Sequence, residues 1–158
     1  MVAERGWNGE DLGVLAGRLL FAVQDELFIR LGEQGFDDIV PRHGVVLAYL
    51  KPDGARATAL ARLSGQAKQS VSLAVDDLEA LGYVHREPDP ADRRAKLVFP
   101  TERGLAQMKA ADAILADIMD RHTRFFGRQE FRRFLSTFHE LVERQRVITS
   151  DAQRRRRL

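Results

Sequence analysis

Residues 56–104 contain a change of hydrophobic period that strongly limits the folds open to this chain. Segments 58–63 and about 67–81 have helical patterns, and Ser64-Gly65 separates them, because glycine adopts backbone angles that other residues avoid. Gly82 then supplies the left-handed residue that often follows a helix. Two helices joined by a short glycine-containing turn predict a helix-turn-helix. One face of the second helix is apolar at three- and four-residue spacing, through Val71, Ala74, Val75, Leu78 and Leu81.

After Gly82 the pattern becomes that of β-strands, and residues 83–87 and 96–99 are expected to pair as a hairpin. The intervening residues 88–95 include two prolines and several charges, so we expect an exposed, turn-rich tip. A hairpin tip that carries Arg93 and Arg94 beside a helix-turn-helix is typical of a wing. Such arginines suit the negative potential of a DNA minor groove. Asp92 is expected to stabilise the wing by pairing with one of these arginines.

The first turns of the second helix carry the residues best suited to reading DNA. No acidic residue occurs between Gly54 and Ser72, whereas the acids of this helix come later. A basic, polar helix N-terminus suits the major groove, where N-terminal residues contact base edges and phosphates. The predicted DNA-binding residues are Lys68, Gln69, Ser70 and Ser72 on the helix, with Arg86, Arg93, Arg94 and Lys96 on the wing.

Five segments of the sequence match a known family: KQSVS at 68–72, VDDLE at 75–79, GYV at 82–84, DPADRRAK at 89–96 and TERG at 101–104. Through these segments the sequence resembles the multiple-antibiotic-resistance regulator (MarR) family over roughly residues 10–148. Leu73 and Ala74 differ from the residues usual in the family, which concerns base preference rather than fold. The resemblance implies a mainly α fold with a small β-hairpin wing, a winged helix-turn-helix flanked by N- and C-terminal dimerisation helices.

Long apolar helices are expected on both sides of the winged region. The expected organisation is a flexible N-terminus (1–10), a dimerisation helix (11–34), a winged region (41–100, with the helix-turn-helix at 58–81 and the wing at 83–99), C-terminal dimerisation helices (101–148) and a basic tail (149–158). The flanking helices have wider apolar faces than one subunit needs, which favours a symmetric homodimer. A monomeric bundle with intrachain packing is the alternative.

The resemblance also implies a function: a homodimeric transcriptional repressor that binds a pseudo-palindromic operator in double-stranded DNA. Members of the family commonly respond to small aromatic or phenolic effectors. Phe21, Phe28 and Tyr49 are apolar candidates for such a site, and His43 is a polar one. Each of these four residues is also compatible with an ordinary core position. A DNA-architectural or protein-interaction module without an effector is the alternative function.

Composition excludes several other classes of protein. The chain has 158 residues, 44% hydrophobic and 30% charged, which suits one soluble domain. The absence of cysteine excludes disulfides and thiol redox sensing. No apolar run could span a membrane, and no signal peptide is recognisable, so a cytoplasmic location is expected. Residues 154–157 are all arginine, and without their four charges the formal charge of +2 becomes −2. Net charge therefore does not itself indicate nucleic acid.

No catalytic, metal or cofactor site is predicted. The four histidines, at 43, 85, 122 and 139, do not have metal-ligand spacing. No glycine-rich phosphate loop, nucleophile elbow or paired-carboxylate site is present. The chain is therefore not expected to be an enzyme.

Overall fold

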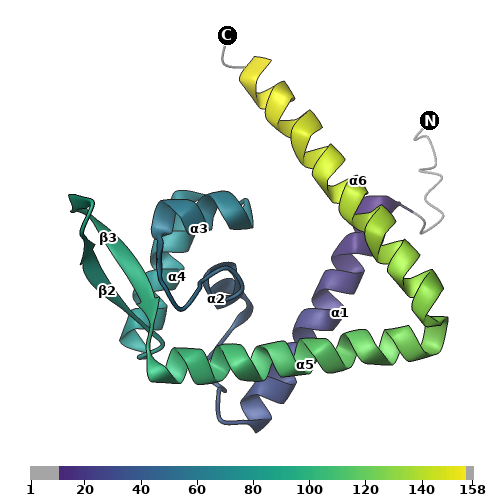
Figure 1. Ribbon diagram of the computed structural model, residues 1–158, viewed down its shortest axis with the longest axis horizontal. Helices are drawn as coiled ribbons and strands as arrows, with labels where there is room; N and C mark the ends of the chain where they lie inside the picture. The colour runs from purple at the N-terminus through teal and green to yellow at the C-terminus, as the bar shows by residue number, and fades with distance from the viewer. Residues whose placement is uncertain (1–10, 156–158) are drawn as a thin grey trace, which may run out of the picture. The chain divides into compact units, whose positions relative to one another are not determined.

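The computed structural model describes residues 11–155, so the N-terminal segment 1–10 and the last three residues of the basic tail lie outside the described residues. The chain divides after Leu115 into two compact units. The first contains the sheet and most of the helices (Figure 1), and the second contains the end of the long helix α5 (Glu102–Phe126) together with α6 (Arg128–Arg155). Within the described residues, none of the helices is both long and apolar enough to cross a bilayer.

The first unit is a winged helix-turn-helix, as predicted. Its elements are α1 (Leu12–Glu33), η1 (Pro41–His43), α2 (Gly44–Leu47), β1 (Ala55–Arg56), α3 (Ala57–Ser64), α4 (Lys68–Ala80), β2 (Val84–Asp89), β3 (Asp92–Pro100) and the N-terminal part of α5 (Glu102–Phe126). The three strands are antiparallel and have the order β1-β3-β2. The N-cap residue of α1 is Asp11, whose side chain accepts hydrogen bonds from the backbone N–H groups of Gly13 and Val14.

The core lies between the helix-turn-helix, α2 and the sheet. The apolar face predicted for the second helix is buried: four of its residues, Val71, Ala74, Val75 and Leu78, are at most 1% exposed. Leu60 of α3 and Val98 of β3 belong to the same cluster. Gly65 and Gly82 end the two helices with φ of 71° and 79°, in the left-handed region that favours glycine. Local period and glycine placement therefore determine this part of the fold.

The winged region begins with the 3-10 turn η1 and the short α2. Two details differ from the sequence-based expectations. The wing has a third strand, β1, which pairs with β3 through Ala55 and Arg56. The hairpin tip is also much shorter than residues 88–95, because β2 and β3 pair as far as Asp89 and Asp92. Pairing reaches that far because Asp89, which was expected to be exposed, is buried and ion-paired.

The second unit consists of the end of α5 and all of α6 (Arg128–Arg155). Gly127, with φ of 85°, separates these helices. Helix α6 extends beyond residue 148 into the segment expected to be a tail, since residues 149–155 contain neither glycine nor proline. A series of aromatic side chains runs through this unit, and the ring centroids of neighbouring members lie 4.8–6.4 Å apart. The series consists of His122, Phe125, Phe126, Phe131, Phe134 and Phe138.

Candidate nucleic-acid interface

The N-terminal end of α4 is exposed and has no side-chain cap. Its N-cap residue is Ala67, which cannot accept a hydrogen bond through its side chain, and the first turn contains no acidic residue. The backbone N–H groups of this turn therefore remain open to an anion, and the helix dipole favours one there. All four residues predicted to read DNA from this helix, Lys68, Gln69, Ser70 and Ser72, are exposed.

The later turns of α4 carry acids that are paired with arginines. Arg86 of β2 lies 2.5 Å from the Oδ1 atom of Asp76 and also forms an ion pair with Glu79. Burial alone would lower the pKa of Arg86, but the hydrogen bonds that Arg86 donates to these two carboxylates outweigh it and raise the pKa. Arg42 donates from Nε to Asp77 at 2.9 Å. Arg86 thus connects the wing to α4 through its guanidinium.

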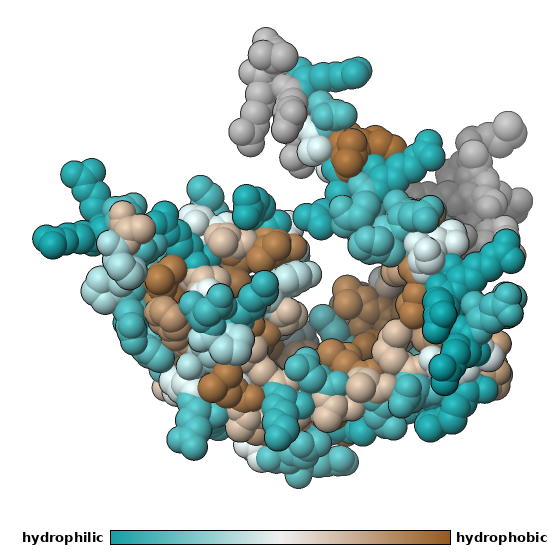
Figure 2. All heavy atoms as spheres, in the orientation of Figure 1, coloured by the Kyte–Doolittle hydropathy of each residue, from teal (hydrophilic) through white to brown (hydrophobic). Residues whose placement is uncertain are grey.

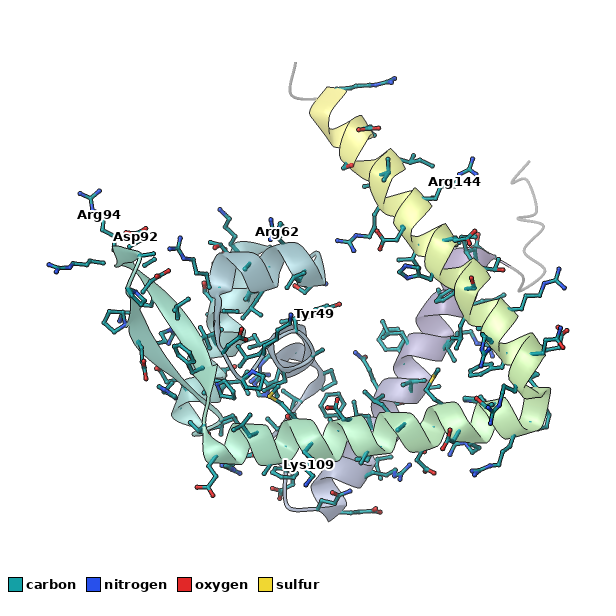
Figure 3. The ribbon with its side chains drawn as sticks, in the orientation of Figure 1. Tyr49, Arg62, Asp92, Arg94, Lys109 and Arg144 are labelled. Carbon is teal, nitrogen blue, oxygen red and sulfur yellow. The ribbon has the colours of Figure 1, made fainter. Side chains whose placement is uncertain are left out.

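The wing tip presents the remaining predicted cations. Arg93, Arg94 and Lys96 are exposed, and Figure 3 shows Arg94 at the tip of the hairpin with Asp92 beside it. The Oδ1 atom of Asp92 accepts a hydrogen bond from the backbone N–H of Arg94 at 3.1 Å. This contact fixes the turn through the backbone rather than through the side-chain pair we had expected. In the space-filling view, this end of the wing is strongly hydrophilic (Figure 2).

An ion pair between β1 and the tip end of β2 was not predicted. Arg56 of β1 donates from Nε to the Oδ2 atom of Asp89 at 2.6 Å. The other carboxylate oxygen of Asp89 accepts from the backbone N–H of Ala91 at 2.8 Å. The Ala91 hydrogen bond, and after it the Arg56 contact, lower the pKa of Asp89. The sequence offered one sign of this pair: Arg56 stands at the N-cap of α3, where a residue that can cap the helix with its side chain is more usual.

A second unpredicted cluster fixes the start of α5. The hydroxyl of buried Tyr83 donates to Asp38 at 2.5 Å, and Arg103 donates to the same carboxylate at 2.9 Å. The guanidinium of Arg103 also lies 4.3 Å from the centre of the Tyr83 ring. Burial would raise the pKa of Asp38, but the Tyr83 hydrogen bond and the Arg103 charge together lower it. A Cβ atom on Gly104 would lie 2.1 Å from the carbonyl oxygen of Tyr83, so this position needs glycine.

A cavity of about 300 Å³ lies in the first unit, lined by residues of α1, α2 and α5. Of the four residues predicted to bind an effector, only Phe28 lines it. Phe21 and Tyr49 are 65% and 41% exposed, whereas His43 is buried and accepts a hydrogen bond from the backbone N–H of Val40. Gln107, which also lines the cavity, was not predicted from the sequence. It could have been noticed as a polar residue on the buried face of α5.

The fold and this surface define a class, the winged helix-turn-helix proteins. A family model described as the MarR family matches residues 38–95. Residues 38–95 are therefore similar to the MarR family of winged helix-turn-helix transcriptional regulators. A search of the curated proteins found no significant match.

Solved structures of similar fold extend the likeness along most of the chain. The transcriptional repressor CouR, bound to a 23-mer DNA duplex, is 25% identical, with 87% of this chain and 96% of that chain covered and a TM-score of 0.70. CouR from Rhodococcus jostii RHA1, bound to p-coumaroyl-CoA, is also 25% identical, with 84% and 92% covered and a TM-score of 0.68. The transcriptional regulator Tm0710 from Thermotoga maritima is 28% identical, with 86% and 94% covered and a TM-score of 0.53.

Proposed function

We propose that this protein is a sequence-specific regulator that binds double-stranded DNA and represses transcription. The observation that carries the proposal is the exposed, uncapped and acid-free first turn of α4. In this proposal Lys68, Gln69 and Ser72 contact bases in the major groove, where glutamine pairs with adenine and lysine with guanine. Ser70 binds either a base edge or a phosphate. The similarity to a repressor bound to DNA supports this assignment.

The wing is proposed to grip the flank of the same site. Arg93 and Arg94 enter the adjacent minor groove or contact its phosphates, and Lys96 adds a phosphate contact. Arg86 has a different proposed role, because its guanidinium is engaged by two carboxylates of α4. It holds β2 against the reading helix, and we expect any phosphate contact from it to be secondary.

The functional molecule is proposed to be a homodimer on a pseudo-palindromic operator. Helix α1 exposes large apolar side chains, including Leu15, Leu20 and Phe21 at 47–65% exposure. The second unit exposes others, including Phe125 at 81% and Val147 at 59%. Surfaces of this kind are typical of subunit interfaces. A twofold dimer would place its two reading helices on half-sites roughly 10 base pairs apart.

An effector is proposed to bind in the cavity and to change the position of α4. Gly44 and Leu47 of α2 line the cavity, and the preceding turn η1 contacts α4 through two side chains. Arg42 hydrogen-bonds Asp77 at 2.9 Å, and the Nε2 atom of His43 lies 3.7 Å from the same carboxylate. A ligand that displaced α2 would therefore act on α4 within one compact unit. Its effect is limited by its difference in affinity between the two states.

Gel-shift titration with the DNA upstream of the protein's own coding region tests the proposal. We expect that duplex to bind at least tenfold more tightly than a shuffled duplex of equal length and composition, with both at the same salt concentration. Equal affinity for the two duplexes would instead indicate an architectural DNA-binding protein. Failure to bind either duplex at low salt would leave a protein-interaction module as the remaining function of the winged unit.

A further inference from the structure

Leu73 is an exposed apolar residue on the outer face of α4. Its side chain is 58% exposed, whereas the opposite face of the helix is buried in the core. Four residues make slightly more than one turn of an α-helix, so Leu73 lies beside Gln69 and about 6 Å further along the axis. Leu73 therefore continues the surface that begins at the uncapped, acid-free first turn of α4.

A single exposed leucine is common on protein surfaces. What distinguishes Leu73 is its position, because the acids in the turn beyond it are already paired. Arg86 forms ion pairs with both Asp76 and Glu79. This pairing partly neutralises the negative charge that would otherwise repel phosphates from the middle of the helix. Leu73 thus lies where a duplex held by the first turn of α4 can reach it.

A leucine side chain has one kind of partner in the major groove. It neither donates nor accepts hydrogen bonds, so it cannot bind a phosphate or the polar edge of a base. The apolar group that the bases present in this groove is the C5 methyl of thymine. Packing of a leucine against that methyl removes both groups from water. Burial of one group of this size corresponds to about fourfold in affinity.

We propose that Leu73 reads thymine through its C5 methyl, in the same half-site as the base contacted by Gln69. The inference rests on the proposed regulatory function and adds a specificity-determining residue to it. The rise of about 6 Å between the two residues spans roughly two base pairs, so the thymine lies within that distance of the base at Gln69. 5-Methylcytosine carries the same methyl group, and the same contact favours it over cytosine.

Replacement of thymine by uracil tests the proposal, because uracil pairs as thymine does and lacks only the methyl. Anisotropy titration measures the affinity of the full-length protein for the upstream duplex and for duplexes in which each thymine in turn is uracil, all at one salt concentration. We expect one thymine in each half-site at which uracil lowers the affinity about fourfold. Uracil at the other thymines should leave the affinity nearly unchanged.

The Leu73→Ala variant assigns the effect to this side chain. It removes most of the apolar group at an exposed position and introduces a residue that favours helix, so α4 should fold as before. In this variant, uracil at the sensitive position should cause no further loss, because the methyl no longer has its partner. Leu63→Ala is the matched control, since Leu63 is an exposed leucine of α3. That substitution should leave the uracil effect in place.

The converse change adds a methyl group to the duplex. The sensitive thymine–adenine pair is first replaced by cytosine–guanine, and that cytosine is then methylated at C5. Methylation should raise the affinity of the unmodified protein about fourfold. In Leu73→Ala it should have no effect on the affinity.

Two results would overturn the inference: selective binding without any uracil-sensitive thymine, or a uracil effect of the same size in Leu73→Ala. Either result would leave the regulatory function standing, because selectivity for the upstream duplex over the shuffled one is measured in the same titration. Equal affinity for those two duplexes would instead refute sequence-specific regulation, and with it the reading of a base by Leu73.

Discussion

Arg56 and Asp89 join the strand before the helix-turn-helix to the end of β2 at the wing tip, although they are 33 residues apart in the sequence. The Asp89 side chain is only 8% exposed, and Arg56 covers it from β1. Because Asp89 also caps the turn at Ala91, one carboxylate fixes both the tip of the wing and its attachment to α3. We therefore expect this pair to set the direction in which the arginines of the tip point.

The Asp89→Asn variant tests that role. It removes a negative charge near the proposed DNA surface, which by itself should strengthen DNA binding. We expect the opposite, a loss of about fivefold in affinity, because the wing is no longer held by Arg56. Glu87→Gln is the matched control, since it makes the same change of charge at an exposed position on β2. Equal effects of the two substitutions in an anisotropy titration would show that the pair does not position the wing.

Base reading by the helix is tested at Gln69. Replacing Gln69 by Ala should cost about 1–3 kcal/mol at one base position and relax the preference there. The measurement compares affinities for operator duplexes substituted at each position in turn. A uniform loss over all these duplexes would assign Gln69 to the phosphate backbone instead.

Arg94 should behave as a contact without sequence preference. In Arg94→Ala we expect weaker binding to every duplex, and a decrease of about one in the slope of log affinity against log salt concentration. Arg144→Ala provides the control, because it removes the same charge from an exposed position on α6 (Figure 3). If the salt slope is unchanged in Arg94→Ala, the wing tip does not touch the DNA.

His43 predicts a dependence of stability on pH. Burial, and after it the charge of Arg42, lower the pKa of His43 below its ordinary 6.5. The unfolded chain therefore takes up a proton near pH 6.5 that the folded chain does not, so the free energy of unfolding falls as the pH decreases below that value. The slope is at most about 1.4 kcal/mol per pH unit.

Chemical denaturation at a series of pH values measures this slope. In His43→Gln the slope between neutral and mildly acidic pH should become shallower than in the unmodified protein. His139→Gln, which changes an exposed histidine of α6, should leave the slope as it was. A slope that is the same in all three proteins would contradict the assignment to His43.

Local sequence patterns predicted the helix-turn-helix and the order of its elements, because helical period and glycine placement act over a few residues. The predicted apolar face of α4 and the predicted helix ends at Gly65 and Gly82 occur in the structure. The predicted extent of the hairpin tip, residues 88–95, was wrong, since the tip depends on Asp89 and on its partner Arg56 elsewhere in the sequence.

Contacts between distant residues could not be predicted in this way. Tyr83 and Arg103 meet Asp38 across 45 and 65 residues, and no local period encodes such a meeting. The cavity could not be predicted from local patterns either, because α1, α2 and α5 each contribute only part of its lining. Gln107 could have been noticed as a polar residue on an apolar face, but the missing partner of its amide is visible only in three dimensions.

Hydroxyl-radical footprinting on the upstream duplex tests the central claim most directly. A symmetric pair of subunits with two reading helices should protect two related segments, with centres roughly one helical turn apart. Arg94→Ala should reduce protection at the outer flanks and leave the two central segments in place. A single protected segment, or continuous protection without a preferred position, would contradict the account of a dimeric, sequence-specific regulator.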